Sequence, residues 1–155
     1  DLTCLGKIIG GGLPIGAYGG LEKIMRHLAP LGNVYQASTF AGNPIVMQVG
    51  ISTLEILKKS AGNYLRMKDL AAYLSFNIRK EAILRNIDLK VSNYGSMFSI
   101  KFKHKTQFRK FYLSMLESDV YFASSEFESN FLSFAHTKMH IEKTIASVKK
   151  ALDKL

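Results

Sequence analysis

The hydrophobic pattern divides the chain into two parts that meet at residues 60–63. In the first part it predicts strands over residues 1–5 and 15–19, a short helix over 21–28, a polar loop over 31–41 and a helix from Pro44 to about Lys58. Asn43 precedes that last helix as an N-cap, and Pro44 suits its first position. The helix is apolar on most of its faces, so we expect it to be buried inside a larger body.

The second part alternates helical and strand patterns. We expect helices over residues 64–85, 107–118 and after Thr137, and strands over 89–91, 97–102, 120–123 and 131–135. Phe98, Ile100 and Phe102 share one face of their strand, because side chains alternate along a strand. The pattern therefore predicts an α/β protein: residues 1–60 as the tail of a large domain, and residues 61–155 as a small α+β C-terminal domain.

Lys7 is the first candidate for chemistry. It is the single basic side chain in Leu5–Gly20, a stretch that holds seven glycines. An ammonium between an apolar strand and a glycine-rich turn is partly desolvated, which favours the neutral amine that forms Schiff bases with carbonyls. The alternative is a surface lysine at a strand end. Gly10–Gly12 matches neither the P-loop nor the dinucleotide-binding fingerprint. We expect it to form a tight turn beside Lys7.

The net charge of +9 raises a different class of function, a basic nucleic-acid-binding module. Such a module would lose affinity steeply as salt rises. The 21 Lys and Arg residues are scattered, however, and form no basic arm or tail. No apolar run reaches the length of a membrane span. We therefore expect neither nucleic acid nor a membrane as a partner.

Residues that form disulfides or bind metals are few. Cys4 is the only cysteine, which excludes an internal disulfide and is compatible with a reducing cytoplasm. We expect it to be a small buried side chain. His136 and His140 are four residues apart, but His136 precedes the Thr137 cap and no third ligand is evident. We expect no metal site.

Two segments together resemble a known family. Leu5–Gly20 and the later Tyr-Gln-Ala-Ser-Thr-Phe-Ala-Gly-Asn-Pro of residues 35–44 are similar to the class III, fold-type I pyridoxal-phosphate aminotransferases. Asn93–Phe98, Phe127-Glu128 and Ala135-His136 extend the likeness to the C-terminal part. The resemblance covers the whole chain and is strongest to the aminomutase branch of the family.

The resemblance implies a role for four residues. Lys7 matches the catalytic lysine that binds pyridoxal or pyridoxamine 5'-phosphate covalently and moves a proton at the substrate. Thr39, with Ser38 before it, matches the hydroxyl residues that hold the cofactor phosphate across a homodimer interface. Glu128 matches an acidic residue near the cofactor, the alternative being a solvated loop carboxylate.

The aminomutase branch implies isomerisation of glutamate 1-semialdehyde, an amino-aldehyde, to 5-aminolevulinate for tetrapyrrole synthesis in the cytoplasm. The alternative within the family is an ω-aminotransferase for an ornithine-like diamine or a γ-amino acid. The family's aspartate for the pyridine nitrogen and its ring-stacking aromatic would precede Asp1. We therefore expect a C-terminal portion of a longer protein that is inactive alone.

Overall fold

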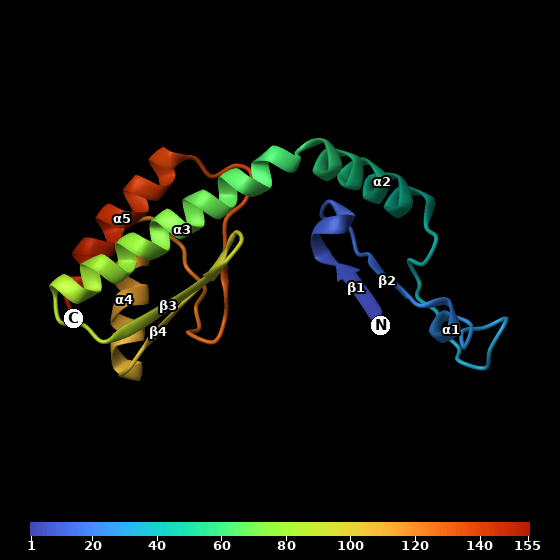
Figure 1. The fold of residues 1–155 in the computed structure, drawn as a ribbon, viewed down its shortest axis with the longest axis horizontal. Coiled ribbons are helices and arrows are strands. Elements are labelled where there is room, and N and C mark those ends of the chain that lie inside the picture. Colours follow the sequence, from blue (N-terminus) through green and yellow to red (C-terminus); the bar gives the residue numbers. More distant parts are fainter. The chain divides into compact units, whose positions relative to one another are not determined.

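The computed structural model describes all residues, Asp1–Leu155, and they form two compact units (Figure 1). The first unit comprises Asp1–Ser60 and the second Ala61–Leu155. That these units are parts of a large cofactor domain and a small C-terminal domain stays a prediction. No helix combines the length and apolar composition that crossing a membrane requires.

The first unit is built on a β-hairpin. Strands β1 (Leu2–Gly6) and β2 (Gly16–Gly20) pair antiparallel over their whole length, and the short 3-10 helix η1 (Lys7–Gly10) follows β1 directly. Both predicted strands are thus confirmed within one residue. Helix α1 (Glu22–Met25) is a single turn, shorter than the predicted helix over residues 21–28.

Helix α2 (Pro44–Lys59) begins where the sequence predicts. The Asn43 side-chain oxygen accepts hydrogen bonds from the backbone N–H groups of Ile45 and Val46, at 3.1 and 3.2 Å. These bonds satisfy two of the donors that a helix start leaves free, which confirms the N-cap.

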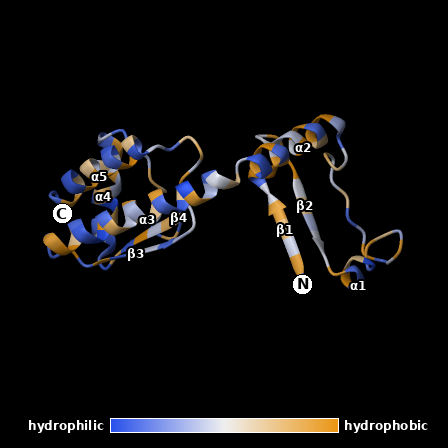
Figure 2. Cartoon of the chain, turned by 45° about the horizontal axis from the view of Figure 1, so that its top comes forward, coloured by the Kyte–Doolittle hydropathy of each residue, from blue (hydrophilic) through white to orange (hydrophobic).

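The burial of α2 inside a larger body stays a prediction, because these 155 residues cover little of the helix. Only Val46 and Gly50 are buried, whereas Ile45 is 70% exposed. Ile51, Leu54 and Ile56 are also each at least half exposed. The hydrophobic residues of α2 appear in orange in Figure 2. A helix that is apolar on most of its faces needs cover on several sides, and within the first unit only the face with Val46 and Gly50 is covered.

The second unit packs helices on a three-stranded sheet. Its elements are α3 (Ala61–Leu84), β3 (Leu89–Tyr94), β4 (Met97–Phe102), α4 (Lys105–Glu117), β5 (Asn130–Phe131) and α5 (Lys138–Leu152). The sheet is antiparallel in the order β3-β4-β5. Phe98, Ile100 and Phe102 are at most 3% exposed, which confirms their shared inward face.

Several elements of the second unit differ from the prediction; the strand expected over residues 89–91, for example, runs to Tyr94. Helix α3 begins at Ala61, so the expected linker over residues 60–63 shrinks to Ser60. Residues 120–123 form no strand, because Ala123 donates its backbone N–H to the side-chain oxygen of Asn130 instead of to a neighbouring strand. The predicted strand over residues 131–135 is confined to the two residues of β5.

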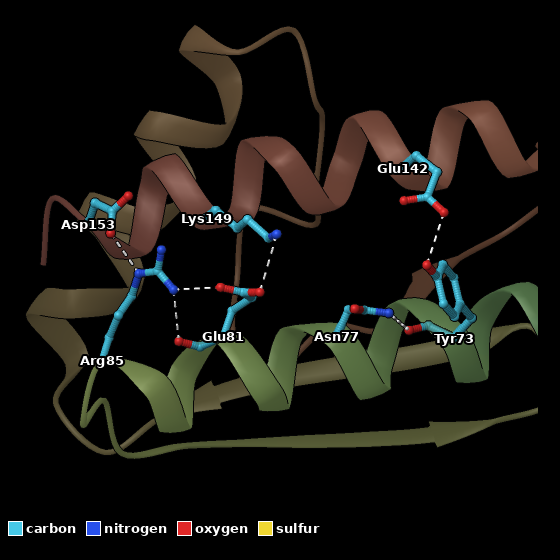
Figure 3. Close-up of polar contacts among 7 residues, drawn as sticks. All are labelled: Tyr73, Asn77, Glu81, Arg85, Glu142, Lys149 and Asp153. Carbon is cyan, nitrogen blue, oxygen red and sulfur yellow. Dashed lines mark hydrogen bonds and ion pairs between the residues drawn. The ribbon is translucent and has the colours of Figure 1, made fainter.

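Charged side chains join α3 and α5 on the rim of the core (Figure 3). Arg85 lies 2.6 Å from the Glu81 carboxylate and 2.7 Å from that of Asp153, while Lys149 approaches Glu81 at 3.4 Å. Burial alone would raise the pKa of Glu81, but the hydrogen bonds from Arg85 and Lys149 outweigh it and lower that pKa. This charge network ties the ends of the two helices together.

Candidate functional site

Lys7 occupies an unusual backbone conformation at the end of β1. Its φ angle is 53°, in the left-handed region that L-residues avoid. The other non-glycine residues with positive φ are Asn86 and Asp119, types that tolerate this region. Strained residues of other types cluster at active sites and ligand clamps. The backbone therefore marks Lys7 independently of its chemistry.

The side chain of Lys7 is not desolvated by this chain. Lys7 is exposed, although Ile9 and Gly10 of the same short helix are buried. The expectation of a partly desolvated ammonium is therefore wrong for these 155 residues. Glycines around the turn behave as predicted: Gly11 and Gly12 have φ angles of 57° and 102°, and Gly11 donates its N–H to Ile8.

Ser38 and Thr39 precede α2 in a tight turn. The Ala41 backbone N–H donates to the carbonyl of Ser38 at 3.0 Å, and the Asn43 N–H donates to that of Phe40 at 3.1 Å. Both hydroxyl residues are exposed, and the N-terminus of α2 is capped by Asn43 rather than by either of them. Their hydroxyl groups are thus free to face a ligand.

A groove of about 630 Å³ lies between the hairpin and the segment that leads into α2. Ser38 lines it together with Cys4 and Tyr18, whereas Lys7 and Thr39 do not. The structure therefore does not gather Lys7 and Thr39 in one groove of a single chain. Cys4 is exposed, so its predicted burial is wrong for these 155 residues: it pairs with Tyr18 across the hairpin and lines the open groove.

Glu128 belongs to the second unit, whereas Lys7, Ser38 and Thr39 belong to the first. It lies in the loop before β5, is exposed, and donates its backbone N–H to the carbonyl of Ser125 at 3.1 Å. The Glu128 carboxylate forms no ion pair with any other residue of the chain. The four candidate residues are thus spread over two units.

Comparison with known proteins decides the family. The sequence matches the family "Aminotransferase class-III" over residues 1–152. The chain belongs to the class III aminotransferases. It is 45% identical to the glutamate-1-semialdehyde 2,1-aminomutase of Thermodesulfovibrio yellowstonii over 100% of its length, and 41% identical to that of Natranaerobius thermophilus over 99%. It spans 39% of the length of each of these relatives.

A solved structure agrees with this assignment. The FumI protein of a Sphingopyxis species, in its pyridoxal-phosphate internal aldimine form, is 25% identical with a TM-score of 0.84. That match covers 99% of this chain and 36% of the other. The α/β fold predicted from the sequence, that of the pyridoxal-phosphate transferases, is therefore confirmed for this class III chain.

The two histidines of the C-terminal unit act in local structure. The Nδ1 atom of His136 accepts the backbone N–H of Ser133 at 2.9 Å, and that of His140 accepts the N–H of Thr137 at 3.2 Å. Both Nδ1 atoms are thus engaged in local turn contacts. No group of three His, Cys, Asp or Glu residues is placed to hold a metal ion.

The packing that supports the turn after Lys7 could not be predicted from the sequence. Ile15 and Gly50 pack against the residues that follow Lys7, and neither carries a chemical signal of its own.

The role of Arg66 was also not predicted from the sequence. Its guanidinium donates to the carbonyls of Phe134, at 2.7 Å, and His136, and so anchors the loop before α5 to α3.

Proposed function

We propose that the full-length protein containing this chain is a pyridoxal-phosphate-dependent aminomutase, an isomerase that converts glutamate 1-semialdehyde into 5-aminolevulinate. The observation that carries the proposal is the identity of 41–45% to aminomutases over the whole chain. The fold and the family would equally suit an aminotransferase. The chain itself is the portion that supplies the lysine.

The side chains of the first unit fit pyridoxal phosphate. Lys7 offers an exposed primary amine at a strained turn, which is the group that condenses with an aldehyde. Ser38 and Thr39 offer free hydroxyl groups, and hydroxyl and backbone N–H groups are the donors that bind phosphate. This donor set supports Lys7 as the attachment point and Ser38 and Thr39 as phosphate ligands.

When bound, the cofactor would serve as an electron sink at the substrate carbon next to nitrogen. The Lys7 amine would act as the acid and base that moves a proton between that substrate carbon and the cofactor. Glu128 would accept a hydrogen bond close to the cofactor. Ser38 and Thr39 are uncharged, so they would hold the phosphate through hydrogen bonds in a fixed geometry and not through opposite charge.

The proposed assembly is a cytoplasmic homodimer. The support for a homodimer is the family resemblance of Ser38 and Thr39 to residues that hold the cofactor phosphate across a subunit interface. The substrate would be a small amino-aldehyde, and we propose neither nucleic acid nor a membrane as a partner.

Borohydride reduction of the full-length protein with pyridoxal phosphate tests the site. We expect the reduced adduct on Lys7 and on none of the other lysines, as read from peptide masses. A Lys7→Ala variant should lose the adduct and the visible absorbance band together. An adduct on another lysine would refute the assignment of Lys7.

A second assay separates the aminomutase from an ω-aminotransferase. An aminomutase moves the amine within one molecule, so glutamate 1-semialdehyde should be isomerised without any added amino acceptor. Turnover that depends strictly on 2-oxoglutarate would reject the aminomutase and favour the aminotransferase, while leaving the Lys7 adduct intact.

A further inference from the structure

One side chain, Ile15, packs between the turn that carries Lys7 and helix α2. Ile15, at the entry to β2, lies between two glycines, Gly10 of η1 and Gly50 of α2. A Cβ atom built on Gly10 would lie 2.5 Å from Ile15 Cγ2, and one built on Gly50 would lie 3.3 Å from Ile15 Cδ1. Both glycines are buried. The absence of side chains at these two positions leaves room for the isoleucine.

The same face of α2 also touches the turn directly. A Cβ on Gly50 would lie 3.5 Å from the carbonyl oxygen of Ile9, and one on Gly11 would lie 2.6 Å from Thr53 Oγ1. The Thr53 hydroxyl is itself fixed, because it donates to the carbonyl of Val49 at 2.9 Å. The chain that follows Lys7 therefore rests on a rigid helical surface.

We propose that Ile15, seated between Gly10 and Gly50, is a positioning residue for the Lys7 amine. Lys7 has a φ of 53°, a conformation that persists only where neighbouring structure enforces it. Ile15 is only partly buried, but a Cβ at Gly10 would lie 2.5 Å from its Cγ2, so no free volume separates these two residues. A displacement of Ile15 therefore passes through Gly10 to Lys7, which precedes it by three residues. This inference rests on the proposed role of Lys7 in holding pyridoxal phosphate.

Gly50→Ala is the perturbation that tests this contact. The added Cβ presses on Ile15 Cδ1, so the full-length protein should bind pyridoxal phosphate at Lys7 about fivefold more weakly. The readouts are the visible absorbance of the lysine-bound cofactor during titration and the fraction of Lys7 modified after borohydride reduction. Gly62→Ala is the matched control: it also replaces a helical glycine, but its Cβ would meet nothing within 4 Å.

Ile15→Val provides the rescue, because it deletes the Cδ1 atom that the alanine would press. The double variant Gly50→Ala, Ile15→Val should return to within about twofold of wild type. Ile15→Val alone adds no volume and so cannot overpack the turn. It should weaken the adduct less than Gly50→Ala does, and circular dichroism should show all variants folded.

The outcomes separate this inference from the function on which it rests. If wild type forms no adduct at Lys7, the proposed function fails and the positioning role with it. If wild type forms the adduct and Gly50→Ala binds pyridoxal phosphate as tightly as Gly62→Ala does, the assignment of Lys7 is retained. The positioning role of Ile15 is then wrong. A loss in Gly50→Ala that Ile15→Val does not restore also overturns the role of Ile15.

Discussion

The charge network between α3 and α5 predicts a defined loss of stability when Glu81 is neutralised. Glu81 has a side chain only 8% exposed, and Arg85 and Lys149 both contact its carboxylate. Glu81→Gln keeps the shape but removes the charge that pairs with two cations. Hydrogen bonds to charged groups contribute about 1.5–3 kcal/mol, so we expect the second unit to lose about 2 kcal/mol of unfolding free energy.

Glu117→Gln is the matched control for this substitution. Glu117 lies in the same unit and pairs with Lys154 at 2.9 Å, but both side chains are well exposed, at 68% and 59%. Exposed ion pairs gain little because water screens them. Urea unfolding followed by far-ultraviolet circular dichroism measures both variants. Equal midpoints for the two variants would refute the claim that burial gives the Glu81 pair its strength.

The same network predicts how stability depends on pH. The pKa of Glu81 lies below its ordinary value in the folded chain. The ionised carboxylate thus stabilises the fold above the ordinary pKa, and this contribution disappears as the pH falls through the lower, folded pKa. Wild type should therefore lose more stability than Glu81→Gln below about pH 4.5. Parallel acid profiles for the two proteins would contradict this assignment.

Three further predictions follow from particular residues. Ile78→Ala should destabilise the second unit by about 2–5 kcal/mol in urea unfolding, because Ile78 is fully buried, whereas Ile83→Ala on the same helix should have little effect since Ile83 is 74% exposed. Asn43→Ala should cost about 1 kcal/mol, read from hydrogen exchange of the Ile45 and Val46 amides, because it removes the cap of α2. The 155-residue chain alone should not isomerise glutamate 1-semialdehyde, and measurable formation of 5-aminolevulinate would disprove this.

Elements with strong local signals could be predicted from the sequence. Residues 97–102 form β4 with the predicted bounds, because three large apolar residues alternate within it. The Asn-Pro pair at residues 43–44 placed the start of α2 to the residue. Both signals are local, so they do not depend on what the rest of the chain does.

Short apolar runs could not be assigned in the same way. Residues 120–123 resemble a strand in composition, yet Phe122 packs into the core from a loop and Asn130 takes the hydrogen bond of Ala123. An apolar run shows that a side chain is buried but leaves the backbone partner open. The candidate site was limited similarly: residue type suggested Lys7 and the family resemblance suggested Thr39, but neither predicted the packing of Ile15.

The uneven burial in the two units connects the fold to the proposed function. Of the hydrophobic residues that are buried, only Ile9 and Val46 belong to the first unit, while eighteen belong to the second. The turn that carries Lys7 thus sits in the unit with the smaller core, beside apolar faces of α2 and β1 that this chain leaves open. Because this chain leaves those faces open, we expect Lys7 to become an effective amine only when they are covered.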